Sequence, residues 1–534
     1  MRRLAAASCL LLAGACSGGG GSSSSAPPPP GPQDPGSGET RVSGASPFDG
    51  GCGGFGGILY RGSEVEPHLV ADPRDPNHLV AAWQQDRWSN GASQGLLAAA
   101  SFDGGASWTA RPLAFSVCGG GTREQGSDYG RATDPWVAFG ADGTVYAIGL
   151  STSGTSFQPG SASAVLVSRS SDGGRTWSAA ATLARDTDAL FDDKETLTAD
   201  PADARLVYAT WDRVDAHAAG TSVFARSVDG GATWGPARVI HDPGPGAQTI
   251  GNLIRVLPDG TLVDLYVRLT GDEHRVTDSA VEAIRSTDRG ATWSAPVRIS
   301  AYRALGAADP ASGRGIRDGS VLAQMAVAPD GSLDVVWQDA RFTGLRDAIA
   351  LSRSVDGGLT WSAPVRVNAD PAIAAFTPQV HVRADGTIGV SYFVLPADRR
   401  DAGAVPVERR LAQSSDGSTW TEIAASAPFD LSSAPLAAGA WFLGDYMGLA
   451  SAGADFLSLY ARTTGSATDA TDLYLARIAP PAGKRAAPYR AEPMPSAEPG
   501  GDFARRVLAH LAGTRASLRE RSPASSRRGG ERMR

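Results

Sequence analysis

The sequence contains few of the residues that most often build metal centres and nucleophilic sites. It has four Cys, five Met and seven His among 534 residues, and the His residues lack the spacing of a metal-ligand set. The P-loop signature that binds nucleotide phosphates is also absent. These absences argue against the common metal- and nucleotide-dependent classes. We expect no metal, no cofactor and no nucleic-acid partner.

The apolar segment at the N-terminus is short. Met1-Arg-Arg is a charged start, and the apolar stretch that follows is too short to span a bilayer, so residues 1–15 are typical of a secretory signal peptide. The stretch ends in Leu12-Ala-Gly-Ala-Cys16, which resembles a bacterial lipobox with Ala13 in the position that usually holds Leu. We expect lipidation of Cys16 and a membrane-anchored protein of the bacterial cell envelope, surface-exposed or periplasmic. The alternative is cleavage after Ala15 and secretion.

Residues 16–57 begin with Cys16, the candidate for lipidation, and then form a stretch rich in Gly, Ser and Pro. Such a composition cannot bury a core and predicts a flexible tether. Two further Cys remain, Cys52 and Cys118. In an oxidising compartment we expect them to form a disulfide; two free buried thiols are the alternative.

One eight-residue pattern recurs six times. The copies are Ser101-Phe-Asp-Gly-Gly-Ala-Ser-Trp108, Ser170-Ser-Asp-Gly-Gly-Arg-Thr-Trp177, Ser227-Val-Asp-Gly-Gly-Ala-Thr-Trp234, Ser286-Thr-Asp-Arg-Gly-Ala-Thr-Trp293, Ser354-Val-Asp-Gly-Gly-Leu-Thr-Trp361 and the shorter Ser414-Ser-Asp-Gly-Ser-Thr-Trp420. Repeats at this spacing indicate an architecture built from similar units.

The chemistry of the octet is that of a turn between two strands. The Asp accepts backbone N–H groups ahead of it, Gly takes positive φ, and Trp anchors the turn to a core. Each octet supplies a single carboxylate, too few for a calcium loop. We therefore assign a structural role to all six aspartates, which are Asp103, Asp172, Asp229, Asp288, Asp356 and Asp416.

The octet resembles the Asp-box, or BNR repeat, of sialidase-like β-propellers, over roughly residues 58–480. The resemblance implies an all-β fold of blades with four strands each. Six units carry an octet and a seventh lacks one, so we expect seven blades, with six as the alternative. The last sheet lacks a fourth strand, and we expect Ile58–Arg61 to supply it and close the ring.

The segment 481–534 differs from the rest in charge. From Lys484 to Arg534 it holds 12 basic and 5 acidic residues, and Phe503–Leu511 has the pattern of a short helix. We expect a disordered basic tail, with adhesion to anionic lipid or polysaccharide as the alternative.

The resemblance also implies a site at one end of the central channel. Exo-α-sialidase activity requires three Arg that clamp a carboxylate, a Tyr nucleophile with a Glu partner, and an acidic proton donor. The resemblance assigns Arg87, Arg213 and Arg462 to substrate binding, Tyr446 as nucleophile with Glu195 or Glu66 as partner, and Arg341 with Asp347 as the acid/base stretch. Ion pairs at strand ends and packed residues at the channel mouth are the alternative roles.

Two functions remain open on this evidence. One is an exo-glycosidase of sialidase type. The other is a non-catalytic propeller that binds a glycan or a protein. The Arg-Ile-Pro motif of sialidases is missing, and the nearest stretch is Tyr60-Arg-Gly62, which favours the second. We expect a glycan ligand and a monomer.

Overall fold

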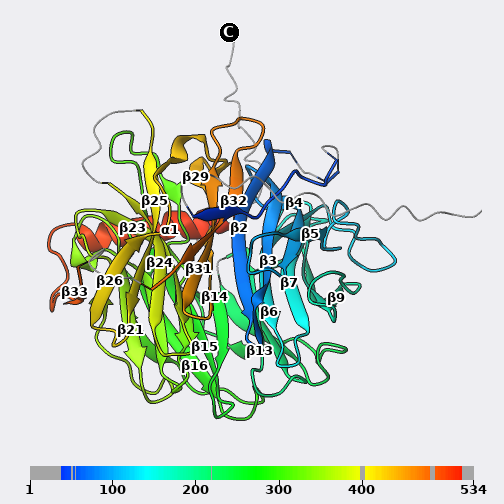
Figure 1. Cartoon of the computed structure of the whole chain (residues 1–534), viewed down its shortest axis with the longest axis horizontal. Coiled ribbons are helices and arrows are strands. Elements are labelled where there is room, and N and C mark those ends of the chain that lie inside the picture. The colour runs from blue at the N-terminus through cyan, green and yellow to red at the C-terminus, as the bar shows by residue number, and fades with distance from the viewer. Residues whose placement is uncertain are drawn as a thin grey trace, which may run out of the picture.

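The computed structural model describes residues 38–49, 52–53, 56–217, 219–272, 274–396, 403–480 and 487–519. Regular structure in these residues is mainly β-strand, with one α-helix, α1 (Phe503–Arg519). Figure 1 shows the strands arranged in several neighbouring sheets. The all-β prediction is confirmed. Cys16 and the signal peptide lie outside the described residues. No helix in the described part of the chain is both long and apolar enough to cross a membrane.

Consecutive strands pair antiparallel in groups of four along most of the chain. The first six groups are β2 (Leu59–Asp72), β3 (Asp75–Trp88), β4 (Ser93–Ser101) and β5 (Thr109–Pro112); β6 (Arg131–Phe139), β7 (Val145–Ser153), β8 (Ala162–Ser170) and β9 (Ala181–Thr187); β10 (Leu190–Ala199), β11 (Val207–Asp215), β12 (Gly220–Ser227) and β13 (Arg238–His241); β14 (Ala247–Val256), β15 (Leu262–Gly271), β16 (Val276–Ser286) and β17 (Val297–Ala301); β19 (Gln324–Val327), β20 (Leu333–Asp339), β21 (Ala348–Ser354) and β22 (Val365–Arg366); and β23 (Ala374–Val382), β24 (Ile388–Leu395), β25 (Pro406–Ser414) and β26 (Thr419–Ala424).

The last sheet draws a strand from the N-terminal part of the chain. β30 (Gly448–Ala452), β31 (Asp455–Thr463) and β32 (Thr471–Ile478) pair in order, and β1 (Glu39–Arg41) pairs antiparallel with β32. The sequence predicts Ile58–Arg61 at this position, but Leu59 and Tyr60 pair with β3 instead. These residues continue the apolar pattern of β2, so they extend the first strand of their own unit.

Part of the predicted tether is ordered. Residues 38–49 contain β1 and two buried apolar side chains, Val42 and Phe48. The segment as a whole is still rich in Gly, Ser and Pro. Its composition therefore predicts a flexible tether and does not reveal that Val42 and Phe48 are buried. The predicted disulfide between Cys52 and Cys118 is present, with a Cα–Cα distance of 5.5 Å.

The predicted disorder after residue 481 is wrong for residues 487–519. β33 (Tyr489–Arg490) pairs with β26, and β34 (Glu492–Pro493) pairs with β22. α1 extends well beyond the predicted Phe503–Leu511 segment. Three of its apolar residues recur every four positions, and that stripe is buried despite the basic composition around it.

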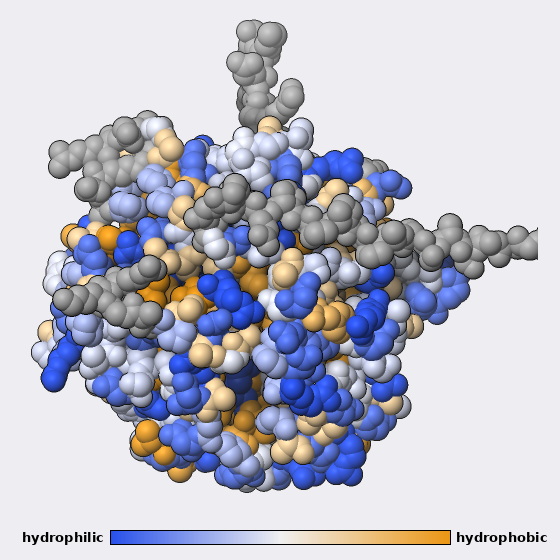
Figure 2. Space-filling model, in the orientation of Figure 1, coloured by the Kyte–Doolittle hydropathy of each residue, from blue (hydrophilic) through white to orange (hydrophobic). Residues whose placement is uncertain are grey.

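Short elements fill the connections. They are β18 (Ile316–Arg317), η1 (Ala340–Phe342), β27 (Phe429–Asp430), η2 (Leu431–Ser433), β28 (Leu436–Ala437) and β29 (Ala440–Phe442). β18 pairs parallel with β29, which joins two distant loops at one end of the sheets. On the face drawn in Figure 2, hydrophobic residues gather near the middle and hydrophilic residues dominate the periphery.

The core is built around aromatic side chains of the second strand in each group. Fully buried examples are Trp83, Tyr146, Trp211, Tyr266, Trp337, Tyr392 and Tyr460. Each such ring removes a large apolar area from water, on the order of 150–250 Å². The recurring second-strand aromatic therefore supplies much of the packing between neighbouring sheets.

The octets form closely similar turns. In five of them one Asp oxygen accepts the backbone N–H of the Ser or Thr four residues later, and the other oxygen accepts its hydroxyl; the pairs are Asp103–Ser107, Asp172–Thr176, Asp229–Thr233, Asp288–Thr292 and Asp356–Thr360. In the shorter sixth copy Asp416 accepts the N–H groups of Ser418 and Thr419. All six carboxylates hold turns.

These turns define one end of the molecule. Leu79, near the hairpin that joins β2 to β3, pairs with Ser101 at the first octet, so hairpins and octets share that end. We call it the Asp-box end. The opposite end, where the first strands begin and where β18 and β29 lie, is called the mouth.

Candidate functional site

The first strands carry a shared irregularity near the mouth. β2, β6, β10, β14 and β23 each contain a β-bulge. The bulges coincide with positive φ at Glu66 (53°), Asp134 (53°), Lys194 (53°), Gly251 (72°) and Thr377 (50°). A left-handed backbone at a residue other than Gly is strained by about 1–3 kcal/mol. Here the bulges turn three charged side chains toward one another.

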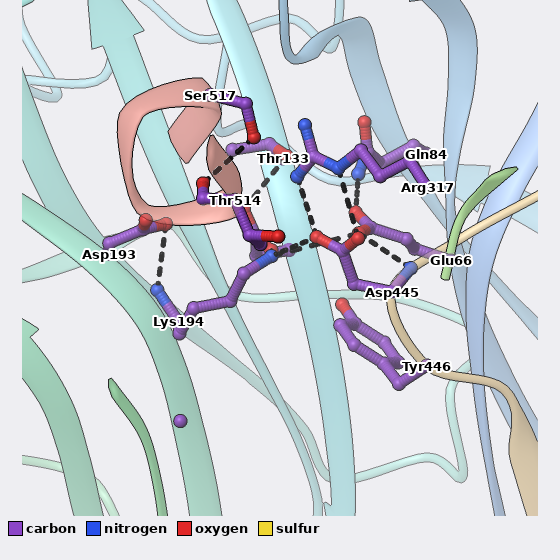
Figure 3. A network of polar contacts seen from close by, with 12 residues as sticks. Glu66, Gln84, Thr133, Asp193, Lys194, Arg317, Asp445, Tyr446, Thr514 and Ser517 are labelled. Atoms are coloured by element: carbon purple, nitrogen blue, oxygen red, sulfur yellow. Dashed lines mark hydrogen bonds and ion pairs between the residues drawn. The ribbon is translucent and has the colours of Figure 1, made fainter. Parts of the chain in front are cut away.

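Those three residues form the centre of a buried ion cluster (Figure 3). Lys194 Nζ lies 2.5 Å from Asp134 Oδ1, 2.8 Å from Asp445 Oδ2 and 3.7 Å from Glu66 Oε1. All four side chains are nearly inaccessible to solvent. Lys194 is one of only two lysines in a chain rich in Arg. A compact ammonium with three donors suits a position enclosed by three carboxylates.

Arg317 extends the cluster. It holds Asp445 bidentately, with Nε 3.0 Å from Oδ1 and Nη2 2.6 Å from Oδ2. The Arg317 guanidinium also lies 4.9 Å from the centre of the Phe442 ring, and that of Arg87 lies 4.7 Å from the same ring. Two guanidinium groups therefore converge beside the acidic cluster.

The surroundings of the cluster shift the pKa values of two neighbouring carboxyl groups, Glu66 and Asp445, in opposite directions. Burial raises the pKa of Glu66 to about 7, although Lys194 acts in the opposite direction. Burial also acts to raise the pKa of Asp445, but Arg317 and Lys194 outweigh it and hold that pKa well below its ordinary value. The backbone N–H of Asp445 donates to Glu66 Oε1 at 3.1 Å. Adjacent carboxyl groups with divergent pKa values are the arrangement that acid and base roles require.

Tyr446 and Glu195 lie next to this cluster. The Tyr446 hydroxyl donates to the carbonyl of Pro135 at 3.0 Å, and burial raises its pKa well above the ordinary value. Burial likewise raises the pKa of Glu195, whose two oxygens have no hydrogen-bond partner among the described residues. Both residues line a cavity of about 20 Å³. That volume accommodates roughly one water molecule and no sugar ring.

The other arginines proposed for a clamp are held apart. Arg213 pairs with Asp186 and Asp192 at 2.5 and 3.2 Å. Arg462 pairs with Glu39 at 3.0 Å and stacks on the ring of Tyr474. Arg87 alone of the proposed three lies at the ion cluster, where Nη1 donates to Gln84.

Arg341 and Asp347 serve the loop in which they lie. Arg341 is bound to Asp339, Ser300 and the carbonyl of Ala301. Asp347 accepts the backbone N–H groups of Leu305 and Gly306 at 2.8 and 2.9 Å. These contacts hold the loop that begins at Tyr302, and they occupy the groups that acid/base chemistry would use.

The helix α1 packs against the mouth. Phe503, Val507 and Leu511 are buried in one hydrophobic cluster with Tyr302. Arg515 Nε donates to Gln248 Oε1 at 2.7 Å, and Nη1 donates to the carbonyl of Asp272. Figure 3 places Thr514 and Ser517 of the helix beside the ion cluster.

A cavity of about 330 Å³ remains between the helix and the mouth. Its polar lining includes Arg317, Asp318, Ser320, Asp445, His510 and Thr514. His510 Nε2 lies 2.7 Å from Ser320 Oγ. The cavity thus offers cationic, anionic and hydroxyl groups in a space of the size that small ligands occupy.

A carboxylate trio lies where β2 meets β32. Oxygens of Glu64, Asp469 and Asp472 lie within 4.8 Å of one another, the one such trio in the described part of the chain. Arg41 is 2.5 Å from Asp472 and 3.7 Å from Asp469. A guanidinium therefore already supplies positive charge to this group.

Sequence reasoning missed Lys194, Asp134, Arg317 and Asp445, and it predicted a short helix at Phe503–Leu511 without placing that helix at the mouth. A signal existed in Asp192-Asp-Lys-Glu195, because four consecutive charges inside a first strand, where burial is expected, require buried partners. Nothing local marks Arg317, whose role depends on the pairing of β18 with β29.

Comparisons with known proteins give structural resemblances at low identity. No family model and no curated protein sequence matches the chain. The chain is similar to the Hadza microbial sialidase Hz136, at 18% identity and a TM-score of 0.41, over 62% of this chain and 64% of that one. It thus spans less than two thirds of that sialidase. An intramolecular trans-sialidase from Ruminococcus gnavus is 15% identical over 82% of this chain and 98% of that one, with a TM-score of 0.38. An α-L-arabinofuranosidase from Fusarium graminearum is 13% identical over 71% and 98%, with a TM-score of 0.43.

Proposed function

We propose that the protein is a sialidase-like β-propeller of seven blades that binds a glycan at its helix-covered mouth. The Asp-box octets and the six groups of four strands support the blade count, together with the sheet formed by β30, β31, β32 and β1. The pairing of β1 with β32 supports closure of the ring by an N-terminal strand.

Recognition without sialidase-type turnover is the function that the geometry supports best. The observation that carries it is the placement of the arginines: Arg213, Arg341 and Arg462 are each paired with a carboxylate. A guanidinium already neutralised in this way is not free to clamp a substrate carboxylate bidentately. Hydroxyl-rich ligands suit the mixed donors and acceptors of the mouth cavity.

Binding can be tested with 3′-sialyllactose and arabinobiose as probes, by calorimetric titration of the full chain. Ser320→Ala and His510→Ala alter polar groups of the cavity, and we expect each to weaken binding of the bound probe several-fold. Ser466→Ala, in an exposed loop, is the matched control. Equal binding by the cavity variants and the parent would contradict a site at the mouth.

A glycoside hydrolase is the second candidate, favoured by the divergent pKa values of Glu66 and Asp445. Glu66 would donate the proton and Asp445 would stabilise the developing positive charge. Turnover of a fluorogenic sialic-acid substrate by the parent, lost in Glu66→Gln and kept in Arg341→Ala and Asp347→Ala, would establish this role. If the parent shows no turnover, hydrolysis of this substrate is ruled out.

We also propose a bacterial envelope protein, anchored through a lipid on Cys16 and monomeric. Incorporation of labelled palmitate by the parent, and its loss in Cys16→Ser, would test the anchor. Unlabelled protein released into the medium would support cleavage after Ala15 and secretion.

A further inference from the structure

A larger cavity lies at the Asp-box end. This chamber has a volume of about 690 Å³ and is lined by the first strands β2, β6, β10, β14, β19, β23 and β30. Pro73, Pro76 and Gly453 on the hairpin turns form its rim. It is twice as large as the mouth cavity and lies at the opposite end of the strands, so it is a separate site.

Among the residues that the structure describes, Arg255 is the one Lys or Arg that lines the chamber. Its Nε donates to the carbonyl of Met325 at 2.9 Å and Nη1 to that of Ile254 at 3.1 Å. No carboxylate among the described residues forms an ion pair with it. Asp72, the single acidic residue of the lining, is bound by Arg74 and His78.

The side chains opposite Arg255 add no second charge. His68 Nδ1 accepts the backbone N–H of Val137, and His381 Nε2 lies 2.9 Å from Ser451 Oγ. Burial, and then Arg255, lowers the pKa of both rings, that of His381 to about 4. Both are neutral at physiological pH, whereas Arg255 keeps its charge because burial lowers its pKa only to about 10.

The rest of the lining is largely apolar. The half-buried apolar side chains of the lining include Val70, Ala138, Phe139 and Val327, and Trp136 is stacked on His68 at 3.6 Å. Two backbone carbonyls compensate the charge of this guanidinium only in part, and apolar side chains lie beside it in the chamber. An anion that brings its own apolar body would satisfy both features, because it would pair the charge and remove apolar surface from water.

We propose that the chamber binds a small organic carboxylate, with its carboxylate on Arg255 and its apolar body against Val70, Phe139 and Val327. The proposal does not depend on glycan binding at the mouth. Inorganic phosphate would use the same cation but not the apolar wall, so the two anions separate charge recognition from recognition of the body.

The experiment is an NMR titration of the full chain with 4-ethylbenzoate, 4-ethylbenzyl alcohol and inorganic phosphate. We expect 4-ethylbenzoate to bind at least about tenfold more tightly than the neutral alcohol, since the charged hydrogen bond to Arg255 is lost. Phosphate should bind more weakly than 4-ethylbenzoate. Equal affinity for the acid and the alcohol, or tighter binding of phosphate, would overturn the proposal, as would no binding of 4-ethylbenzoate at millimolar concentration.

The variant Arg255→Gln should lose about tenfold or more in affinity for 4-ethylbenzoate while binding the alcohol as the parent does. Arg175→Gln removes an exposed guanidinium from an Asp-box turn and is the matched control. Unchanged affinity of Arg255→Gln for 4-ethylbenzoate would refute the assignment. If that variant does not fold, the acid–alcohol comparison on the parent still decides it.

Discussion

The two ends of the sheets are built from the same strands but differ in how their charged groups are paired. At the mouth, Glu66, Asp134, Lys194, Arg317 and Asp445 crowd together out of water beneath α1. At the Asp-box end, each carboxylate of the repeated turns is bound by its own octet near the surface, and Arg255 faces the chamber without an acidic partner. Residues that recur in every unit stabilise the fold, whereas residues that occur once form the sites.

The largest effect should come from removing the central cation of the mouth. Lys194→Met leaves Asp134, Glu66 and Asp445 buried with less compensating charge, and we expect a loss of about 3–5 kcal/mol in the free energy of unfolding. Urea denaturation measures it. Arg205→Met, which breaks an exposed pair with Asp203, should change stability little. Similar effects of the two substitutions would contradict the contrast between the ends.

The helix should depend on its buried stripe. Leu511→Ala removes a fully buried side chain of α1 and should cost about 2–5 kcal/mol of local stability. Hydrogen exchange would report this as faster exchange of residues 503–519 with little change in the sheets. Leu359→Ala at an octet, where the side chain is 55% exposed, is the control. Protection of α1 that survives Leu511→Ala would show that the helix is held mainly by polar contacts such as those of Arg515.

The repeats made the fold predictable from the sequence, but only some of the residues at the mouth could be predicted. Each turn that contains Asp172 or one of its five counterparts lies within about eight consecutive residues. The strand end, the turn and the Trp anchor can therefore be recognised together in the sequence. Lys194 and Asp445 are 251 positions apart, and no local pattern indicates that they meet. The stripe of Phe503, Val507 and Leu511 was visible, but the basic residues around it favoured disorder. Tyr446 and Glu195 were expected near the axis, and they do line a common cavity.

A smaller effect is expected at the Asp-box end. Asp172→Ala removes hydrogen bonds from Thr176 and Ser170, which should cost about 1–2 kcal/mol. Burial acts to raise the pKa of Asp172, but the hydrogen bonds from Thr176 and Ser170 together outweigh it and lower the pKa to about 2. A depressed pKa gives stability that is present above the unfolded value near 4 and lost as pH falls toward 2. Unfolding measured from pH 2 to 5 should therefore depend less on pH in the variant. An unchanged slope would mean that the carboxylate is not held by the turn in solution.

The mouth should respond to pH in the opposite direction. The pKa of Glu66 is raised from 4.5 to about 7, so between these values the folded state keeps a proton that the unfolded state has released. Stability contributed by this group is therefore full below about 4.5 and falls as pH rises toward 7. Glu66→Gln should remove that decline, so the variant should become more stable than the parent as pH rises toward 7, because its neutral amide has no proton to release. Urea denaturation between pH 4.5 and 7.5 measures the slope. If the stability of the parent instead rises across this range, and the variant shows the same rise, Glu66 is ionised in the cluster. The two ends would then respond to pH in the same direction.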